Sequence, residues 1–506
     1  MNFGAALSHG ARTFRDRPAL SFEGHILTYW EFNGRVNRLA NALLKAGLRK
    51  GDHVAFATHN IPQGIEVYWA AAKAGLVAVP LNIILRRPEI ARVFASARVR
   101  ACIVEKKLLD RLPVPNAARI DLVIDPDNHG TDSYETFLAA ADPAEPAVDV
   151  DPEEPCTVMF SSGTTSRPKG IVSSHRARAL ACLIYAAEFG LSFEARTLHT
   201  TPLYHNSTLI LCLSTLAVGG CVVLDRHFDA RRTLALCHQE RITHALLVPT
   251  QLNRILGSAS AASSRMPATL RCLVSVGEPL AEPIRQRVLS EMTSRLYILY
   301  GTSEGLATVL RPEQQPSHGS SVGLPVLHTE IRVVGDAGAE MPPDTIGEIV
   351  GRSARQMSGY YGDPQATAAT VRNGWIYTGD LGVIDPQGFL RVVGRKKEMI
   401  ISGGVNIYPF DIEQVVMTHD AVAEAAVVGI PDEHWGEAVK LVVALRPGAI
   451  LTAEELMSWC REQLPGYQRP KVVEIRAVLP RNAAGKLLKN ALADPTEQGR
   501  SGTHGF

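Results

Sequence analysis

The segment FSSGTTSRPKG (residues 160–170) is dense in hydroxyl groups and carries two glycines and two cations. An apolar, β-rich run (156–160) precedes it, and IVSSH and then an Ala/Leu-rich run of helical periodicity follow it, so we expect a loop between a buried strand and a later helix. Hydroxyls and backbone N–H groups in such a loop suit phosphate oxygens, and Lys169 adds positive charge. A flexible polar loop is the alternative. The P-loop pattern does not fit, because no Gly-Lys-Ser/Thr sequence follows.

Five more stretches combine polar or charged side chains with glycines in ways that a hydrophobic core does not require. They are PLYHNS (202–207), YGTSEG (300–305), YTGD (377–380), GRKKEMIISGGVNIYP (394–409) and PRNAAGKLLK (480–489). Taken singly, each has an ordinary explanation in turn chemistry, in a solvated basic surface or in a structural histidine. Their occurrence together and in this order is harder to explain in that way.

The elements that must hold these stretches alternate between helical and strand patterns. The first third has an amphipathic helix over 28–48, strands over 52–58 and 100–105, and a helix followed by a strand over 64–81. This alternation continues through the middle of the chain and predicts an α/β fold with layered, largely parallel sheets. Two short strand patterns around a Pro/Gly turn at 330–353 predict a β-rich subregion.

The pattern restarts after Lys397 with its own alternation of strands and helices. One of these helices (452–464) opens with a capping-box-like pair, Thr452 and Glu455. We therefore predict a large N-terminal domain (1–396), a small, mobile C-terminal α+β domain (397–493) and a disordered tail (494–506).

Composition excludes several classes of protein. The 506 residues are too many for one core, and 20% charged with 46% hydrophobic residues is an ordinary globular balance. A net charge of +1 argues against general binding of nucleic acid or anionic membrane. The eight cysteines include no C-x-x-C pair, which indicates core residues of a reduced protein rather than disulfides or a zinc site. No signal peptide is recognisable, and two glycines interrupt the most apolar stretch (208–224), so we expect a cytoplasmic protein without an integral membrane segment.

In type and order the motifs resemble those of the adenylate-forming superfamily, which contains acyl-CoA synthetases, nonribosomal peptide adenylation domains and luciferases. The resemblance runs over nearly the whole chain, and SGTTSRPKG is particularly similar to the phosphate loop of acyl-CoA ligases. It implies a two-step reaction that uses ATP and Mg²⁺. A carboxylate attacks the α-phosphate of ATP to give an acyl-adenylate and pyrophosphate, and a thiol, usually that of coenzyme A, then displaces AMP. Cations and hydroxyls must converge where negative charge develops on the phosphate.

The resemblance also implies roles for individual residues. Lys486 would reach the α-phosphate and the substrate carboxylate, Ser303 would bond the phosphate, and Glu304 would hold Mg²⁺ together with Thr164. His205 would help to admit the carboxylate. The residues implied to bind ATP or AMP are the phosphate loop (Ser161, Ser162, Gly163, Thr164, Thr165, Lys169), the adenine walls (Gly277, Glu278, Pro279, Tyr300), the adjoining Gly301 and Thr302, and the ribose ligands Asp380 and Arg395. Those implied for the acyl pocket are His205, Asn206, Ser207, Thr250, Gly301, Thr302 and Leu306.

The resemblance implies that the small domain turns about Lys397, at the hinge position, between the two half-reactions. The turn would replace Lys486 near the adenylate by a glycine loop, along which a thin pantetheine arm can pass close to the backbone. The residues implied to bind CoA are Gly403, Gly404, Arg469 and Lys471. Two positions depart from the superfamily pattern: Val405 stands where glutamate is usual, and Glu278 puts a carboxylate beside adenine or the base of the pocket.

An acid–CoA ligase is the favoured function, and its expected substrate is a hydrophobic acyl or aryl acid, since no aspartate is placed to hold an amino group. One alternative is adenylation followed by transfer to an acyl-carrier protein or a partner enzyme in trans, because the Val405 departure leaves the thiol acceptor open. Another is a non-catalytic nucleotide sensor, against which the retention of Lys486, Glu304 and Asp380 argues. We expect a monomer or a homodimer.

Overall fold

The computed structural model describes residues 2–113, 120–125, 133–160, 168–258, 264–481 and 487–493. It divides into two compact units. The first comprises Met1–Leu280, Gln286–Ile331 and Val350–Tyr377, and the second Ala281–Arg285, Arg332–Ile349 and Thr378–Phe506. The domain boundary between residues 396 and 397 stays a prediction, and the predicted tail (494–506) lies outside the described residues.

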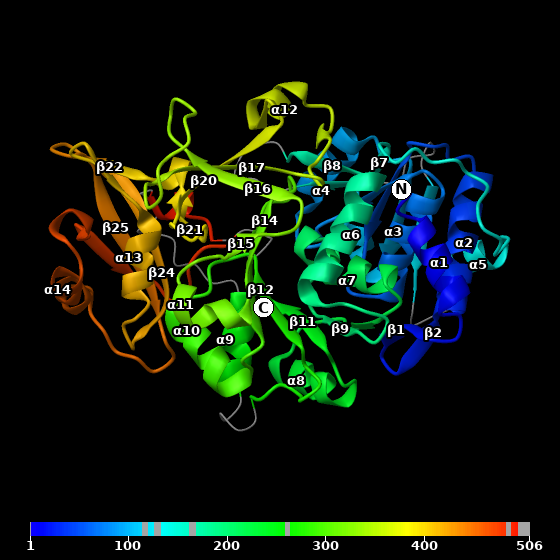
Figure 1. Cartoon of the computed structure of the whole chain (residues 1–506), viewed down its shortest axis with the longest axis horizontal. Helices are drawn as coiled ribbons and strands as arrows, with labels where there is room; N and C mark the ends of the chain where they lie inside the picture. Colours follow the sequence, from blue (N-terminus) through cyan, green and yellow to red (C-terminus); the bar gives the residue numbers. More distant parts are fainter. Residues whose placement is uncertain are drawn as a thin grey trace. The chain divides into compact units, whose positions relative to one another are not determined.

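One sheet of the first unit carries the strands on either side of the hydroxyl-rich loop (Figure 1). Its order is β18 (Gly359–Tyr360), β8 (Gly170–Ser174), β7 (Pro155–Phe160), β4 (Val77–Pro80), β3 (His53–Ala57), β5 (Ala101–Glu105), β6 (Ile120–Ile124). In β3, Val54 and Phe56 belong to one apolar cluster, and Ala55 and Ala57 to another. Since successive strand residues point to opposite faces, both faces of this sheet are covered.

The second sheet of this unit brings YGTSEG to a strand end. Its order is β15 (Leu324–Pro325), β14 (Ala307–Leu310), β13 (Leu296–Gly301), β12 (Cys272–Val276), β11 (His244–Leu247), β9 (Arg196–His199), β10 (Cys221–Leu224), β1 (Pro18–Phe22), β2 (His25–Thr28). Strands β12 and β13 are parallel, with Val276 opposite Leu299. The carboxyl ends of the two strands therefore meet at one edge of the sheet.

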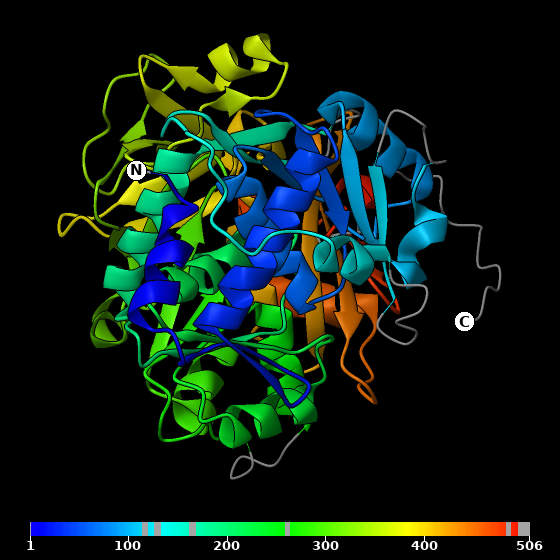
Figure 2. The same ribbon diagram turned by 90° about the vertical axis from the view of Figure 1, so that its right-hand side faces the viewer.

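Helices cover these sheets, and α1 and α2 face the viewer in Figure 2. The helices are α1 (Ala5–Thr13), α2 (Tyr29–Lys45), α3 (Pro62–Lys73), α4 (Arg87–Ala97), α5 (Ser133–Ala139), α6 (His175–Phe189), α7 (Asn206–Ala217), α8 (Ala230–Gln239), α9 (Pro249–Ser258), α10 (Glu282–Arg287), α11 (Gln315–His318) and α12 (Pro364–Thr370). A capping box of Thr28 and Glu31 starts α2. Helices α6 and α7 lie side by side (Figure 1).

The predicted β-rich subregion is a third sheet. Its order is β16 (Thr329–Val334), β17 (Gly347–Ser353), β20 (Trp375–Ile384), β19 (Val371–Arg372), and β21 (Leu390–Arg395) pairs with β20. The division between the two units passes along the chain through β16, β17 and β20.

The C-terminal part of the second unit has its own sheet and core. The sheet order is β23 (Val405–Ile407), β22 (Ile400–Ser402), β25 (Gly436–Leu445), β24 (Val422–Asp432), with β26 (Val472–Ile475) parallel to β25. The helices are α13 (Pro409–Val416), α14 (Ala453–Gln463) and α15 (Asn490–Ala493). Helix α14 connects the parallel strands β25 and β26, in agreement with the predicted alternation of strands and helices, and the Thr452–Glu455 capping box is present.

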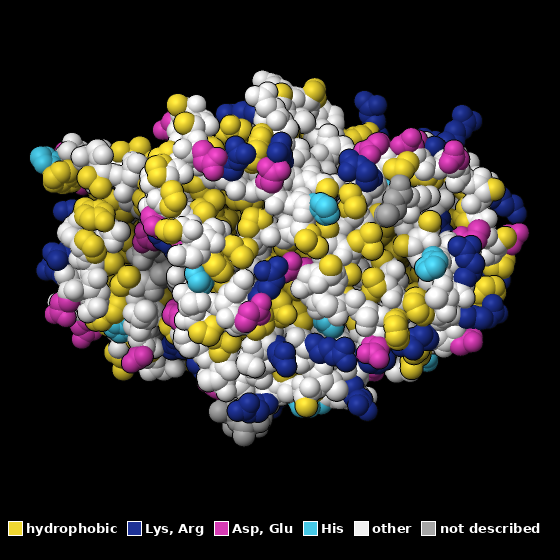
Figure 3. Space-filling model, viewed as in Figure 1, with side chains coloured by type: hydrophobic (Ala, Val, Ile, Leu, Met, Phe, Trp, Pro, Cys, Tyr) yellow, Lys and Arg dark blue, Asp and Glu magenta, His cyan; other side chains and the backbone are white. Residues whose placement is uncertain are grey.

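The predicted fold class is confirmed: an α/β chain with a large N-terminal part of layered sheets, a β-rich subregion and a small C-terminal domain. All eight cysteines are buried and free. The apolar stretch at 208–224 is the helix α7, a turn and the strand β10, as predicted. In the described part of the chain, no helix is both long and apolar enough to cross a membrane. On the face drawn in Figure 3, basic and acidic side chains are interspersed.

Candidate active site

The hydroxyl-rich loop lies in sequence between two antiparallel, paired strands, β7 and β8, and the helix α6 follows β8. The predicted ligands Ser161, Ser162, Gly163, Thr164 and Thr165 lie outside the described residues. Lys169, the last residue before β8, is described, and its Nζ lies 4.8 Å from the centre of the Tyr360 ring. Two paired strands of one sheet therefore flank the loop, and its lysine lies over an aromatic face.

Tyr360 connects this lysine to the predicted metal ligand. It lies on β18, which pairs with β8 so that Tyr360 stands opposite Ile171. Its hydroxyl donates a hydrogen bond of 2.9 Å to Oε1 of Glu304. Burial, together with the Glu304 carboxylate, raises the pKa of Tyr360, so the phenol keeps its proton and remains a donor. Lys169, Tyr360 and Glu304 form what we call the Lys169–Tyr360–Glu304 cluster.

The YGTSEG loop is fixed by its backbone, which leaves its side chains available. The backbone N–H of Met357 donates to the Glu304 carbonyl (2.8 Å), and the Ser353 hydroxyl donates to the Gly305 carbonyl (2.7 Å). Ser303 is exposed, whereas the buried Thr302 Oγ1 has no hydrogen-bond partner among the described residues. An orphaned buried hydroxyl is costly unless a ligand supplies its partner.

The predicted adenine walls are neighbours in the second sheet. Gly277 directly follows β12 and Tyr300 lies near the end of β13, one residue beyond the Val276–Leu299 pair. Gly277 has a φ of +99°, which favours glycine, and Glu278 and Pro279 follow it as exposed residues. The backbone segments at Gly301 and Leu306 approach each other closely, and this requires a glycine at 301, because a Cβ there would lie 2.8 Å from the Leu306 carbonyl oxygen.

The PLYHNS loop leads into α7, and a buried amide holds it. Asn60 accepts a hydrogen bond from the Leu203 N–H (3.0 Å) and donates to the Thr201 carbonyl (3.0 Å). His205 is the N-cap residue of α7, and burial lowers the pKa of its imidazole to about 4. At neutral pH this side chain is uncharged, so it can act on a carboxylate by hydrogen bonding but not by charge.

The other predicted acyl-pocket residues lie on separate elements. Asn206 and Ser207 form the first turn of α7 and are half-buried, and Leu306 is buried directly after YGTSEG. Thr250 is exposed in the first turn of α9. Their convergence around an acyl group stays a prediction.

In the second unit the predicted ribose ligands form a pair. Asp380 and Arg395 stand opposite each other on β20 and β21, and Arg395 Nε lies 3.2 Å from Asp380 Oδ1. The backbone N–H of Asp380 donates to Thr378 Oγ1 (3.0 Å). Asp380 is buried, and its arginine partner is partly exposed. The predicted hinge residue Lys397 lies in a 3-10 turn directly after β21.

The predicted CoA loop is the turn between β22 and β23. Gly403 and Gly404 both have positive φ, +57° and +79°. The Gly403 N–H donates to the Trp435 carbonyl (2.8 Å), and a Cβ at Gly403 would lie 2.5 Å from the Trp435 ring. Val405 is exposed at the start of β23. The remaining predicted residues of this step are Arg469 and Lys471, which are exposed, and Lys486, which lies outside the described residues.

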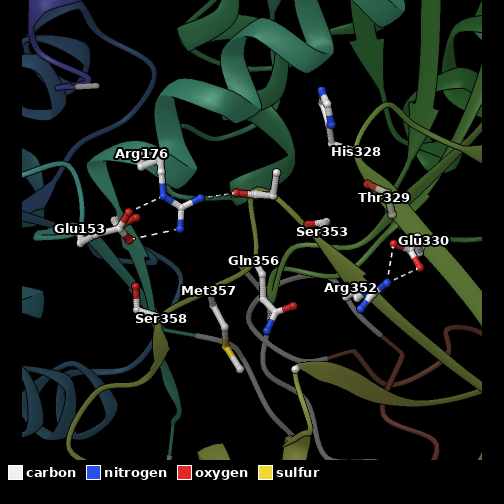
Figure 4. Close-up of a pocket in the computed structure, with 13 residues that line it drawn as sticks. Glu153, Arg176, His328, Thr329, Glu330, Arg352, Ser353, Gln356, Met357 and Ser358 are labelled. Carbon is white, nitrogen blue, oxygen red and sulfur yellow. Dashed lines mark hydrogen bonds and ion pairs between the residues drawn. The ribbon is translucent and has the colours of Figure 1, made fainter.

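The first unit also has an open cavity of about 840 Å³, which none of the predicted site residues lines, although two of its lining residues, Ser353 and Met357, hydrogen-bond to the backbone of the YGTSEG loop (Figure 4). Its arginines already have carboxylate partners: Arg176 pairs with Glu153, and Arg352 pairs with Glu330 at 2.8 Å. Because these charges are neutralised, the cavity lacks the unpaired cations that a phosphate site requires.

Sequence reasoning missed three residues of this region. Tyr360 had no signal beyond the pattern GYYG. Arg178 could have been found, because it shares a helical face with the apolar Cys182 and Tyr185 in α6 and must therefore be a buried cation. Arg355 follows a strand in an irregular segment, where no periodicity predicts burial.

The scan against family models matches residues 7–361 to the AMP-binding enzyme family, and residues 411–486 to the AMP-binding enzyme C-terminal domain. The chain belongs to the AMP-binding enzyme family. The resemblance to adenylate-forming enzymes is therefore confirmed.

Relatives of this AMP-binding enzyme match it over nearly its whole length. A feruloyl-CoA synthase of Amycolatopsis sp is 36% identical over 483 residues, which cover 95% of this chain and 96% of that protein. An indoleacetate–CoA ligase of Aromatoleum aromaticum is 34% identical, covering 94% of each chain. The fatty acid–[acyl-carrier-protein] ligase ScoC of Streptomyces coeruleorubidus is 32% identical, covering 94% of this chain and 93% of its own.

Solved structures agree with this placement. The o-succinylbenzoate CoA synthetase MenE of Bacillus subtilis, in complex with the acyl-adenylate OSB-AMP, has a TM-score of 0.86 at 28% identity, covering 97% of this chain and 98% of that one. A second structure of the same enzyme, with ATP and magnesium ion, has the same TM-score and identity, covering 97% and 99%. Acid–thiol ligation through an adenylate, the class of reaction predicted from the motifs, is the class that these names state.

Proposed function

We propose that this AMP-binding enzyme is an AMP-forming acid–CoA ligase whose adenylation site is built on the Lys169–Tyr360–Glu304 cluster. The observation that carries the proposal is the hydrogen bond from Tyr360 to Glu304, with the Lys169 Nζ 4.8 Å from the centre of the same ring. A cation and a carboxylate therefore both contact one aromatic residue, at the end of the hydroxyl-rich loop. A cation beside the phosphates and a carboxylate for their metal are the groups that phosphoryl chemistry needs.

In the first half-reaction an oxygen of the substrate carboxylate attacks the α-phosphorus of ATP, and the bond to the β-phosphate breaks to release pyrophosphate. Lys169 directly precedes β8 and Ser303 lies in the turn after β13, and from these positions they can bind phosphate oxygens as negative charge develops. The orphaned Thr302 hydroxyl gains a partner when a nucleotide phosphate enters. The neutral His205 orients the carboxylate without competing for it as a counter-ion.

The donor chemistry of this chain suits Mg²⁺. Magnesium prefers carboxylate oxygens and phosphates, and Glu304 offers a half-buried carboxylate that a neutral donor, Tyr360, orients. Glu304, with Thr164, would hold the ion. When bound, Mg²⁺ neutralises charge on the phosphate oxygens.

In the second half-reaction the sulfur of the thiol attacks the acyl carbon, and AMP leaves. Asp380 would accept the ribose hydroxyls, because the ion pair with Arg395 on the neighbouring strand orients its carboxylate. Lys486 would serve the first step and the Gly403–Gly404 turn the second, with Lys397 as the hinge. The clash of any Cβ at Gly403 with Trp435 shows how closely that turn is packed on one side, while Gly404 is open on the other.

Coenzyme A is the acceptor that we favour. Val405 removes the charge expected in the turn, yet the turn keeps both glycines and their positive φ, which are what a pantetheine arm requires of the backbone. Transfer to a carrier protein in trans is the second candidate, since a carrier also presents a pantetheine thiol and one relative, ScoC, is named for such a transfer.

The proposal is tested by measuring pyrophosphate release with ATP, Mg²⁺ and a panel of carboxylic acids, with and without CoA. We expect acid-dependent pyrophosphate release, and acyl-CoA when CoA is present. Acid-dependent pyrophosphate without acyl-CoA for any acid would move the acceptor to a carrier protein. No acid-dependent pyrophosphate at all would refute the adenylation site and leave a nucleotide sensor.

A further inference from the structure

Two buried arginines without carboxylate partners face one small cavity of the first unit. Arg178, on α6, is 7% exposed, and Arg355, after β17, is 8% exposed. Both line a small, partly open cavity of about 30 Å³. Among the described residues, neither forms an ion pair with an aspartate or glutamate. Burying one unpaired charge is costly, and burying two beside one cavity is more so, because they also repel each other.

Arg178 is only partly satisfied by neutral groups. Its Nη1 donates to Asn206 Oδ1 (3.0 Å) and its Nη2 to Thr157 Oγ1 (2.8 Å), while Nε has no hydrogen-bond partner among the described residues. The bond to Asn206 ties this cation to the first turn of α7, where the acyl pocket was predicted. The neutral acceptors orient the guanidinium without cancelling its charge.

Arg355 is less satisfied still. Its guanidinium carbon lies 4.9 Å from the centre of the Tyr185 ring, and both Nε and Nη2 lack a hydrogen-bond partner in the part of the chain that the structure describes. A guanidinium that packs on an aromatic face and has no counter-ion keeps its N–H donors available. An anion can then accept hydrogen bonds from these donors.

The rest of the lining joins this cation pair to the reaction site. Ser303 and Gly305 of the YGTSEG loop lie at the cavity, and its remaining walls are mostly apolar side chains of α6 and α7, such as Cys182, Leu209 and Ile210. A volume of about 30 Å³ has room for about two water-sized groups, which suits the two oxygens of a carboxylate better than a ring or an alkyl chain.

We propose that the acid this enzyme activates carries a second carboxylate, and that Arg178 and Arg355 bind this second carboxylate while the first reacts beside Ser303. The inference rests on the proposed function and names its substrate class: a compact dicarboxylic acid, in place of the hydrophobic monoacid expected from the motifs. The diacid must be compact, because Ser303 and both arginines border one small cavity and the two carboxylates therefore bind close together.

The first arm of the test uses the wild-type enzyme and matched pairs of acids, such as benzoate with isophthalate and terephthalate, and butyrate with succinate and glutarate. We expect one diacid to exceed its monoacid partner in kcat/KM for pyrophosphate release by about 30-fold or more, as for a buried, hydrogen-bonded charge pair. A wild type that prefers the monoacid in every pair overturns the inference but leaves the ligase proposal standing. If none of the acids gives acid-dependent pyrophosphate release, the proposed function itself is refuted.

The second arm uses Arg355→Gln, Arg355→Lys and Arg178→Lys, each checked for folding by its melting temperature. We expect Arg355→Gln to lower the diacid-to-monoacid ratio of kcat/KM by about 30-fold, and the lysine variants to retain part of the ratio. The matched control is Arg176→Gln, which removes an exposed, glutamate-paired arginine two residues from Arg178 on the same helix. If Arg355→Gln instead raises the KM for ATP equally with every acid, the arginines bind a phosphate and the inference is wrong.

Discussion

Removing the hydroxyl of Tyr360 separates the two contacts that build the proposed adenylation site. Tyr360→Phe deletes the 2.9 Å hydrogen bond to Glu304 but keeps the ring that lies 4.8 Å from the Lys169 Nζ. A hydrogen bond to a charged group contributes about 1.5–3 kcal/mol, which is about a 10- to 150-fold change in an equilibrium constant. Glu304 is half-buried, so we expect the lower end of this range, a roughly tenfold loss.

The assay is pyrophosphate release at varied Mg²⁺ and ATP with one activated acid. We expect Tyr360→Phe to raise both the Mg²⁺ concentration for half-maximal rate and the KM for ATP, because Glu304 loses its orientation. Tyr361→Phe is the matched control, since it removes the hydroxyl of the next residue, whose ring packs against His53 (4.7 Å between ring centres). Mg²⁺ and ATP profiles of Tyr360→Phe that match the wild type, or an equal change in Tyr361→Phe, would refute the role given to the cluster.

Three further predictions concern other parts of the chain. In Gly403→Ala the added Cβ would lie 2.5 Å from Trp435, whereas in Gly404→Ala φ is also positive but the surrounding space is open. Gly403→Ala should therefore slow thioester formation in single turnover more than Gly404→Ala. Equal effects of the two variants would mean that only backbone strain from the positive φ matters. Burial lowers the pKa of His175 from 6.5 to about 4, so between these pH values the imidazole is protonated in the unfolded chain but not in the folded protein. The free energy of unfolding should therefore fall as the pH drops from 6.5 to 4, by roughly 2 kcal/mol at pH 5. His175→Gln should flatten this part of the urea-unfolding profile, and an unchanged profile would contradict it. Lys486→Ala should lower the rate of adenylation by about 100-fold or more and still convert a supplied acyl-adenylate to thioester. Near-normal pyrophosphate release by this variant would contradict the role of Lys486 at the α-phosphate.

Much of the fold was predictable because the signals were local. The helical period over 28–48 and the capping pair Thr452–Glu455 depend on neighbours in sequence, and the structure has α2 and α14 at these places. The largely parallel sheets could also be predicted, because the alternation of strand and helix patterns is likewise local in sequence. The pairing of β18 with β8 could not be predicted in this way, because residues about 190 positions apart meet there.

The site was predictable only where a motif carries its own chemistry. The roles of Glu304 and Asp380 were predicted from short stretches and stay predictions, while the structure shows a partner for each side chain, Tyr360 and Arg395. Tyr360 itself was missed because its role depends on contacts across the sheet and not on its sequence neighbours. Arg355 was missed for the same reason: a polar residue in an irregular segment carries no signal of burial until its surroundings are known.

The central claim, that a carboxylate is activated through an adenylate and passed to CoA, is tested most directly with an acid labelled by ¹⁸O in its carboxyl group. The acid, ATP, Mg²⁺ and CoA are incubated with the enzyme, and the products are quantified by mass spectrometry. The account predicts acyl-CoA, AMP and pyrophosphate in equal amounts, with one ¹⁸O atom transferred to AMP. Formation of ADP and phosphate, or AMP without the label, would contradict it.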